Sequence, residues 1–182
     1  SGELVRTFGQ GKPVNALAIA TKSSLLLKAT DEDVQIWDVV SGSLIRSLAK
    51  RQNSEEHIRD AKFSPDSKMV LVGAGTLEEP GKNTPAENDV VELWTIADGS
   101  LVRRFNTESL DTLSGYVKIA VSPDGNAIAA ASGCNSDIHI WNANDGRPIN
   151  RLKTTSIVDP AKFRDCKYGI VFSIDSSKLL MN

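Results

Sequence analysis

The chain has 182 residues, of which 40% are hydrophobic and 24% charged, and its formal net charge at pH 7 is −2. This is the composition of a globular protein that is long enough to bury a hydrophobic core. A nucleic-acid-binding protein normally carries a basic stripe, and a membrane-spanning helix needs roughly 20 apolar residues in a row. The sequence has neither pattern, so we expect neither nucleic acid nor a membrane among the partners.

The two cysteines, Cys134 and Cys166, are far apart and have no paired metal-ligand spacing. They favour reduced thiols in an intracellular protein, cytoplasmic rather than nuclear, with a disulfide between them as the alternative. The sequence also lacks a metal-ligand cluster and a phosphate-binding glycine loop, so we expect no metal and no other cofactor.

A glycine-led pattern of seven residues occurs four times along the chain. Gly-Glu-Leu-Val-Arg-Thr-Phe at 2–8 returns in related form at 42–48, 99–105 and 146–152. The leading glycines are 40, 57 and 47 residues apart. A period near 40–45 residues is typical of one supersecondary unit that is used repeatedly, each copy burying its apolar face on the next.

Each period contains four short strand patterns separated by turn residues. The first strand, as at 58–63, leads into a Ser-Pro-Asp turn at 64–67. The second, as at 25–29, is almost wholly apolar, which predicts burial of both of its faces. The fourth strand is the glycine-led pattern itself. The third strand ends on a tryptophan in every copy, at 34–37, 91–94 and 138–141.

These patterns divide the chain into units. Residues 2–8 are predicted to be the last strand of a preceding unit, and residues 169–182 the first two strands of a further one. Three complete four-stranded units lie between them, at 13–48, 58–105 and 115–152. The sequence therefore predicts an all-β protein of three complete antiparallel sheets with flanking strands.

The period, the four strands, the Ser-Pro-Asp turns and the Trp37-Asp38 pair resemble the WD-repeat β-propeller family. That family places a turn-forming Asp six residues before the tryptophan. Asp and Asn both occupy this position here, and both tolerate left-handed backbone. The resemblance implies structural roles for the three tryptophans and for the three turn residues: Trp37, Trp94, Trp141, Asp31, Asn88 and Asn135.

The repeats depart from the family pattern in two respects. Only the first tryptophan is followed by Asp, and the Gly-His pair that many family repeats carry before the first strand is absent. The family's buried Asp-His-Ser-Trp hydrogen-bond network cannot form in its usual shape. We therefore expect degenerate blades whose stability depends mainly on apolar packing.

The resemblance implies a partial β-propeller, because propellers of this family typically have about seven blades. Each blade face is apolar, and an open ring would expose a larger apolar patch than a monomer usually tolerates. We expect the remaining blades of a longer chain to cover these faces, or a second copy to complete the ring.

Strand direction sorts the connections into two groups, because adjacent antiparallel strands place alternate connections at opposite ends. Short, similar turns lie at one end, here called the short-turn end. The longer connections, 49–57, 75–88, 106–115 and 153–167, lie at the other, the long-loop end. Binding residues concentrate on irregular loops, so we expect the partner at the long-loop end. Tolerated insertions without a function are the alternative.

The sequence offers six candidates for partner contact at the long-loop end: His57, Arg59, Tyr116, Lys118, Tyr168 and Glu87. Arginine and tyrosine are favoured at interaction hot spots. The resembled family often turns side chains at the start of the first strand toward the central channel. Simple solvation is the alternative for each candidate. The pair Lys50-Arg51, followed by Glu55-Glu56, is interpreted as a solvated mixed loop.

The resemblance implies a non-catalytic scaffold that mediates protein–protein interaction within a larger assembly. The alternatives are a propeller enzyme of hydrolase or lactonase type, or a regulatory domain of a multidomain enzyme. A metal-dependent enzyme would need carboxylates or histidines at matching first-strand positions, and those positions hold Ala16, Arg59, Val117 and Tyr168. His57 has no nucleophile pattern beside it. His139 occupies a polar position shared with Gln35 and Glu92, which predicts a structural role.

Overall fold

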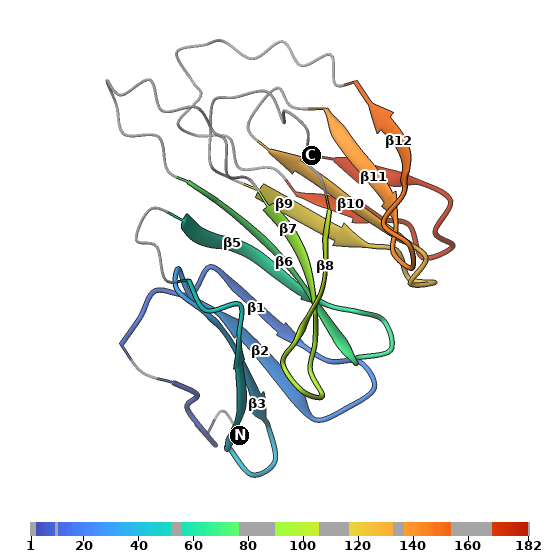
Figure 1. Ribbon diagram of the computed structural model, residues 1–182. Helices are drawn as coiled ribbons and strands as arrows, with labels where there is room; N and C mark the ends of the chain where they lie inside the picture. The colour runs from blue at the N-terminus through green and yellow to red at the C-terminus, as the bar shows by residue number, and fades with distance from the viewer. Residues whose placement is uncertain are drawn as a thin grey trace.

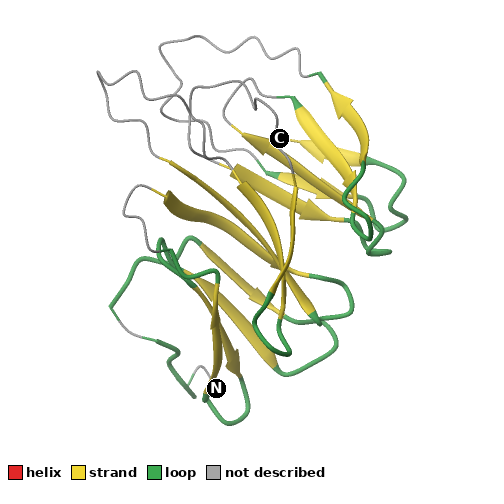
Figure 2. Ribbon diagram, viewed as in Figure 1, coloured by secondary structure: helices red, strands yellow, loops and turns green. Residues whose placement is uncertain are grey.

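The computed structural model describes residues 3–9, 11–51, 56–76, 90–105, 117–132, 137–153 and 169–181. Within these residues the chain consists of strands and turns, and no helix is present (Figure 2). The strands form successive antiparallel sheets that fan out one after another along the chain (Figure 1). The predicted fold class, an all-β partial propeller of four-stranded blades, is confirmed.

Three sheets have four strands in sequence order, and a fourth sheet has two. Blade 1 contains β1 (Ala16–Ile19), β2 (Leu25–Ala29), β3 (Val34–Asp38) and β4 (Leu44–Leu48). Blade 2 contains β5 (Glu56–Phe63), β6 (Met69–Thr76), β7 (Val90–Thr95) and β8 (Leu101–Phe105). Blade 3 contains β9 (Val117–Val121), β10 (Ala127–Ser132), β11 (Ile138–Asn142) and β12 (Pro148–Leu152). The two-stranded blade 4 contains β13 (Ile170–Phe172) and β14 (Leu179–Met181).

Residues 3–8 are not a strand, although the sequence pattern predicted the last strand of a preceding blade. A fourth strand pairs with the third strand of its own blade, and no such neighbour lies beside residues 3–8 in the described part of the chain. The segment still contacts blade 1, because the ring of Phe8 packs edge-on against Trp37 with the ring centroids 6.1 Å apart.

The hydrophobic core lies between successive blades rather than inside any one of them. Leu27 and Ile36 of blade 1 share one buried cluster with Val70 and Val72 of blade 2. Blades 2 and 3 enclose a second cluster, and blades 3 and 4 a third. Each sheet is therefore held mainly by its neighbours, as expected for stacked blades of a propeller.

Strand β6 shows how one sheet serves two of these clusters. Because successive side chains of a strand point to opposite faces, Val70 and Val72 pack toward blade 1 while Leu71 packs toward blade 3. Gly73 faces blade 3 at very close range. A Cβ atom added there would lie 3.0 Å from side-chain carbons of both Val117 and Ile119. The almost wholly apolar composition of the second strand thus follows from burial on both faces.

The Ser-x-Asp turn between the first two strands of a blade is closed by side-chain hydrogen bonds. The Ser64 hydroxyl donates to Asp66 Oδ1 at 2.6 Å, and the Ser173 hydroxyl donates to Asp175 Oδ1 at the same distance. The serine oxygen in turn accepts the main-chain N–H of Met69, which opens β6, or of Lys178, which directly precedes β14. These donors stabilise the ionised carboxylate, and they lower the pKa of Asp175 to about 2.

Arginines of the fourth strand join blade 1 to blade 2 and blade 2 to blade 3. Arg46 donates from both terminal nitrogens to the carbonyl oxygens of Ala97 and Asp98, at 3.0 Å each. Arg103 makes the same contacts with Asn144 and Asp145, at 3.2 and 2.8 Å. In both cases the acceptors belong to the β-turn between the third and fourth strands of the following blade. Arg6 repeats the contact by donating to the Ser41 carbonyl of blade 1.

The glycine that leads each fourth-strand pattern is required by this contact. Gly99 and Gly146 have φ angles of +79° and +76°, in the left-handed region that side chains disfavour. A Cβ atom at Gly146 would also lie 2.7 Å from Cδ of Arg103. The seven-residue pattern found in the sequence therefore has two structural causes. Its arginine contacts the turn of the next blade, and its glycine leaves space for the arginine of the preceding blade.

Replacing Ser173 by alanine is expected to raise the pKa of Asp175 from about 2 toward its ordinary value of 3.8, because the strongest donor to the carboxylate is lost. The wild-type carboxylate stabilises the turn above pH 4, and this stabilisation disappears as the pH falls toward 2. NMR titration of the Asp175 carboxyl carbon measures the change. Asp66, whose donor Ser64 is untouched, should keep its lowered pKa; an unchanged Asp175 titration in S173A would contradict the assignment.

Replacing Arg103 by alanine is expected to lower the free energy of unfolding by about 1.5–3 kcal/mol, because charged hydrogen bonds across the interface of blades 2 and 3 are lost. Chemical denaturation measures this change. Arg147→Ala is the matched control, since the Arg147 side chain is 85% exposed and its ion pair with Asp145 is worth less than about 1 kcal/mol. Equal losses for the two variants would show that the contact between blades contributes nothing.

Candidate protein-interaction surface

The described part of the long-loop end lies mainly where blades 1 and 2 meet. It includes the turn between β2 and β3, the connection from β4, and the beginning of β5. Five residues that the sequence singled out fall outside the described residues: Glu87, Asn88, Tyr116, Asn135 and Tyr168. Both cysteines also fall outside. The candidates whose positions are described are His57, Arg59, Lys118, Asp31 and the three tryptophans.

Asp31 connects blade 1 to blade 2. Its carboxylate accepts a hydrogen bond from Asn15 Nδ2 at 2.7 Å, and its main-chain oxygen accepts the Ile58 N–H at 3.0 Å. The same Asn15 nitrogen donates to the Ile58 carbonyl, also at 2.7 Å. The turn between β2 and β3 is therefore hydrogen-bonded to the beginning of β5, the first and innermost strand of blade 2. The resemblance implied only a local turn role for Asp31, and this contact between blades is additional.

His57 and Arg59 both approach this carboxylate. His57 Nδ1 lies 3.8 Å, and Arg59 Nη1 3.6 Å, from Asp31 Oδ1. The His57 side chain is 26% exposed and that of Arg59 is 11% exposed, so His57 is partly open to solvent and Arg59 is largely buried. We call Asn15, Asp31, His57 and Arg59 the Asp31 cluster. Two of the six predicted contact residues are thus brought together.

A β-bulge at Arg59 shapes this part of β5. Ile58 pairs with Ala74 and Asp60 with Gly73, so Arg59 is an extra residue in the ladder. A bulge re-aims the side chains that follow it. Asp60 is consequently buried, and its carboxylate accepts the main-chain N–H of Ala61 at 3.0 Å and that of Ile119 in blade 3 at 3.3 Å. No sequence motif predicts this bulge. The only signal is the polar pair Arg59-Asp60, which interrupts an otherwise strand-like pattern.

Lys118 lies on β9, one residue into the innermost strand of blade 3, and its side chain is half-buried. It therefore belongs to a different blade from the Asp31 cluster. Trp94 and Trp141 lie at the interfaces between blades, whereas Trp37 packs against Phe8 of the N-terminal segment. Trp141 is buried against Phe105 of blade 2 with the ring centroids 5.7 Å apart, while Trp37 and Trp94 are half-buried.

Arg51 forms a buried ion pair, so the interpretation of its segment as a solvated mixed loop was wrong for this residue. Its side chain is only 6% exposed, and Nη2 lies 2.8 Å from Oε2 of the fully buried Glu92. Glu56 accepts from the other terminal nitrogen at 3.2 Å, and Arg104 Nε lies 3.0 Å from Glu92 Oε1. Charge compensation makes burial of Arg51 and Glu92 possible, which local sequence cannot reveal because they are far apart in the chain.

The polar residue two positions before each tryptophan contacts the indole. Gln35 and Glu92 accept the indole N–H of Trp37 and Trp94 at 3.3 and 3.0 Å. His139 instead stacks on Trp141, with the ring planes 24° apart. Burial, aided by the nearby charge of Arg151, lowers the pKa of His139 below its ordinary value, which favours the neutral imidazole near neutral pH.

The described residues contain no group of three or more His, Cys, Asp or Glu side chains placed to hold a metal ion. Among the same residues, no helix has the length and apolar character needed to cross a membrane.

Replacing Glu92 by glutamine is expected to lower the free energy of unfolding by about 3–5 kcal/mol, because the buried Arg51 would lose its buried carboxylate and keep only the partly exposed Glu56 as an ionic partner. Thermal or urea unfolding measures the loss. Glu32→Gln removes a carboxylate from the exposed Lys12–Glu32 pair and should leave the free energy of unfolding close to that of the wild type, because solvent screens exposed ion pairs. Wild-type stability of E92Q would show that the buried pair is energetically neutral.

Comparison with known proteins identifies the repeat. The model of the WD40 family, described as WD domain, G-beta repeat, matches residues 107–142. The curated protein COMPASS component SWD3 of Saccharomyces cerevisiae is 23% identical over 195 residues, which cover 77% of this chain and 58% of that protein.

Three solved structures share the fold. The β-propeller domain of Cps50 (Swd1) of Myceliophteria thermophila matches with a TM-score of 0.60 and 16% identity, over 93% of this chain and 47% of that one. The RRP9 WD40 repeats match with a TM-score of 0.59 and 15% identity, over 80% of this chain and 40% of that one. Kuenenia stuttgartiensis hydrazine synthase matches with a TM-score of 0.62 and 16% identity, over 91% of this chain and 42% of that one. At these identities the likeness concerns the fold alone. The chain spans roughly half the length of the proteins it resembles. Together with the stacked four-stranded blades, these likenesses show a partial β-propeller in which residues 107–142 match a WD repeat.

Proposed function

We propose that this chain is a non-catalytic scaffold that binds a protein or peptide partner at its long-loop end, within a larger assembly. The observation that most supports it is the Asp31 cluster, in which His57 and Arg59, on the first strand of blade 2, lie 3.8 and 3.6 Å from the Asp31 carboxylate of blade 1. Side chains held in place before binding lose little conformational entropy when a partner docks. The similarity to a protein named as a COMPASS component supports a role in an assembly.

The outer faces of the partial propeller suggest where the rest of that assembly lies. Leu17 and Ile19 of β1 are exposed on the face of blade 1 that points away from blade 2. Val171 and Leu180 are exposed on the face of blade 4 that points away from blade 3. Further blades, from the same polypeptide or from a second copy, would cover both faces.

The enzyme alternative has less support. The first residues of the innermost strands include Ala16 and Val117, which supply neither a nucleophile nor a metal ligand. The similarity to hydrazine synthase concerns the fold and does not transfer its chemistry. The intracellular, cytoplasmic location expected from the cysteines stays a prediction.

Affinity purification with quantitative mass spectrometry tests the proposed surface. The double variant His57→Ala/Arg59→Gln is expected to lose at least one partner recovered with the wild type, by about tenfold or more, because interaction energy is concentrated in a few anchored side chains. Arg147→Gln, at the short-turn end, should recover the same partners as the wild type. Thermal unfolding of each variant establishes that the fold is intact. Identical partner sets for all three proteins would place binding elsewhere on the molecule.

A further inference from the structure

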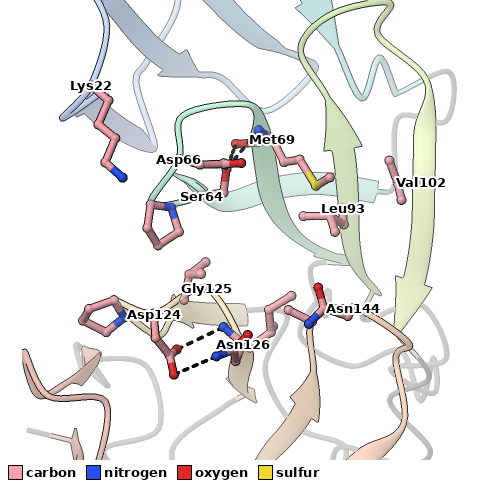
Figure 3. A pocket seen from close by; sticks show the side chains of 15 residues that line it. Lys22, Ser64, Asp66, Met69, Leu93, Val102, Asp124, Gly125, Asn126 and Asn144 are labelled. Atoms are coloured by element: carbon pink, nitrogen blue, oxygen red, sulfur yellow. Dashed lines mark hydrogen bonds between the residues drawn. The ribbon is translucent and has the colours of Figure 1, made fainter.

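A pocket lies at the short-turn end, opposite the Asp31 cluster. It occupies the interface between blades 2 and 3 and has a volume of about 380 Å³ (Figure 3). Leu93 and Met69 line it from blade 2, and Val121, Ile128 and Ala143 line it from blade 3. The two Ser-x-Asp turns bring Asp66 and Asp124 to its edge. We call it the interface pocket.

The repeats themselves show why the pocket exists. The main-chain N–H of Ile96 donates to the Lys68 carbonyl in blade 2, and the N–H of Ala143 donates in the same way to the Asn126 carbonyl in blade 3. Ala143 is therefore the structural equivalent of Ile96. At the interface of blades 1 and 2, Ile96 is a nearly buried member of the hydrophobic cluster. An alanine at the same place in blade 3 leaves space that an isoleucine would fill.

A second pair of equivalent residues changes in the same direction. Phe63 and Val121 are both the last residue of an innermost strand, each directly before the serine of a Ser-x-Asp turn. Phe63 packs against the cluster of blades 1 and 2, whereas Val121 packs against that of blades 2 and 3. Two large side chains are thus replaced by two small ones at one interface. The facing blade does not compensate for this loss of volume. Met69, the first residue of β6, is equivalent to Leu25, the first residue of β2, and is only slightly larger.

The edge of the pocket is acidic. The hydroxyls of Ser64 and Ser122 donate to Asp66 and Asp124, and these donors hold the pKa of both carboxyls below the ordinary value. Both side chains are therefore ionised at neutral pH. Lys22 of blade 1 is the single cation among the described lining residues, so the carboxylates outnumber it. An apolar floor with an anionic edge fits a ligand that combines an aliphatic group with a positive charge.

We propose that the interface pocket binds an extended peptide segment of a protein partner, with an aliphatic side chain inserted between blades 2 and 3 and a Lys or Arg side chain beside Asp66 and Asp124. The Asn144 side chain, which also lines the pocket, is proposed as a partner for the peptide main chain, while the Asn126 side-chain nitrogen donates to Asp124. This surface is at the opposite end from the Asp31 cluster. One chain can therefore hold two partner segments at the same time.

The repeats supply the variant that tests this proposal. Val121→Phe/Ala143→Ile places in blade 3 the two residues that blade 2 already accommodates at equivalent positions, so it fills the pocket with a packing the fold tolerates. Dodecapeptides are selected from a displayed random library on the wild-type protein and then measured on both proteins by fluorescence polarisation. We expect selected peptides with an aliphatic residue close to Lys or Arg, and an affinity at least about tenfold lower for the filled variant, as loss of one buried aliphatic side chain implies.

A second variant tests the pocket without changing any buried side chain. Val102 lines the pocket and is 46% exposed, so Val102→Asp places a charge in its wall without disturbing a buried side chain. Val40→Asp makes the same change at a position of blade 1 that is 75% exposed and outside the pocket. Binding should fall for V102D and persist for V40D.

The results separate this proposal from the one for the long-loop end. Peptides that depend on the pocket should bind the His57→Ala/Arg59→Gln variant as tightly as the wild type. The proposal is overturned if no peptide is enriched, if enriched peptides bind the filled variant equally well, or if they lack a basic residue. Binding of a fatty acid to the pocket, with no peptide binding, would also overturn it.

Discussion

Apolar contact between neighbouring blades is the constraint on which this structure depends. A four-stranded sheet of this size has two faces to bury, and the sheet itself can cover neither of them. Strand β10 illustrates the consequence, because Ala129 and Ala131 pack toward blade 4 while Ile128 and Ala130 pack toward blade 2. Small residues on both faces bring successive sheets close together. The stability of each blade is therefore a property of its interfaces.

Polar contacts then fix the relative position of the blades, which apolar packing alone leaves free to slide. Arg46 and Arg103 donate to main-chain oxygens of the following blade, and Asp60 accepts from the main chain of blade 3. Main-chain acceptors do not depend on the side chains of the accepting residues, Ala97, Asp98, Asn144 and Asp145. The contact therefore tolerates sequence drift at these positions, while the glycine that follows them stays fixed.

The strands of this fold are predictable from the sequence because their signals are local. Tryptophan at the end of the third strand, the Ser-x-Asp turns and the apolar second strand each follow from contacts within one repeat or with the next. The failures have a common physical cause. Arg51 and Glu92 compensate each other across 41 residues of sequence, and residues 3–8 match a strand pattern without a partner to pair with. Charge pairing and strand pairing are decided by the neighbour, which a local pattern does not contain.

The two candidate surfaces were also only partly predictable from the sequence. His57 and Arg59 could be selected from their position before a recognisable turn, whereas the bulge at Arg59 is indicated only by the polar pair Arg59-Asp60. The interface pocket was visible in principle, since aligning the repeats shows alanine and valine where the preceding repeat has isoleucine and phenylalanine. Its significance becomes clear only when the structure shows that both substitutions fall on one interface.

The arginine contacts also mean that a contact and its partners are never contained in one sheet. Blade 2 contains the acceptors Ala97 and Asp98 without their donor, whereas residues 42–98 contain both these acceptors and Arg46. A fragment cut at sheet borders would lose this contact at its first sheet, and a fragment that begins with the preceding fourth strand would keep it. The unit joined by its own hydrogen bonds is thus staggered by one strand relative to the visible sheets.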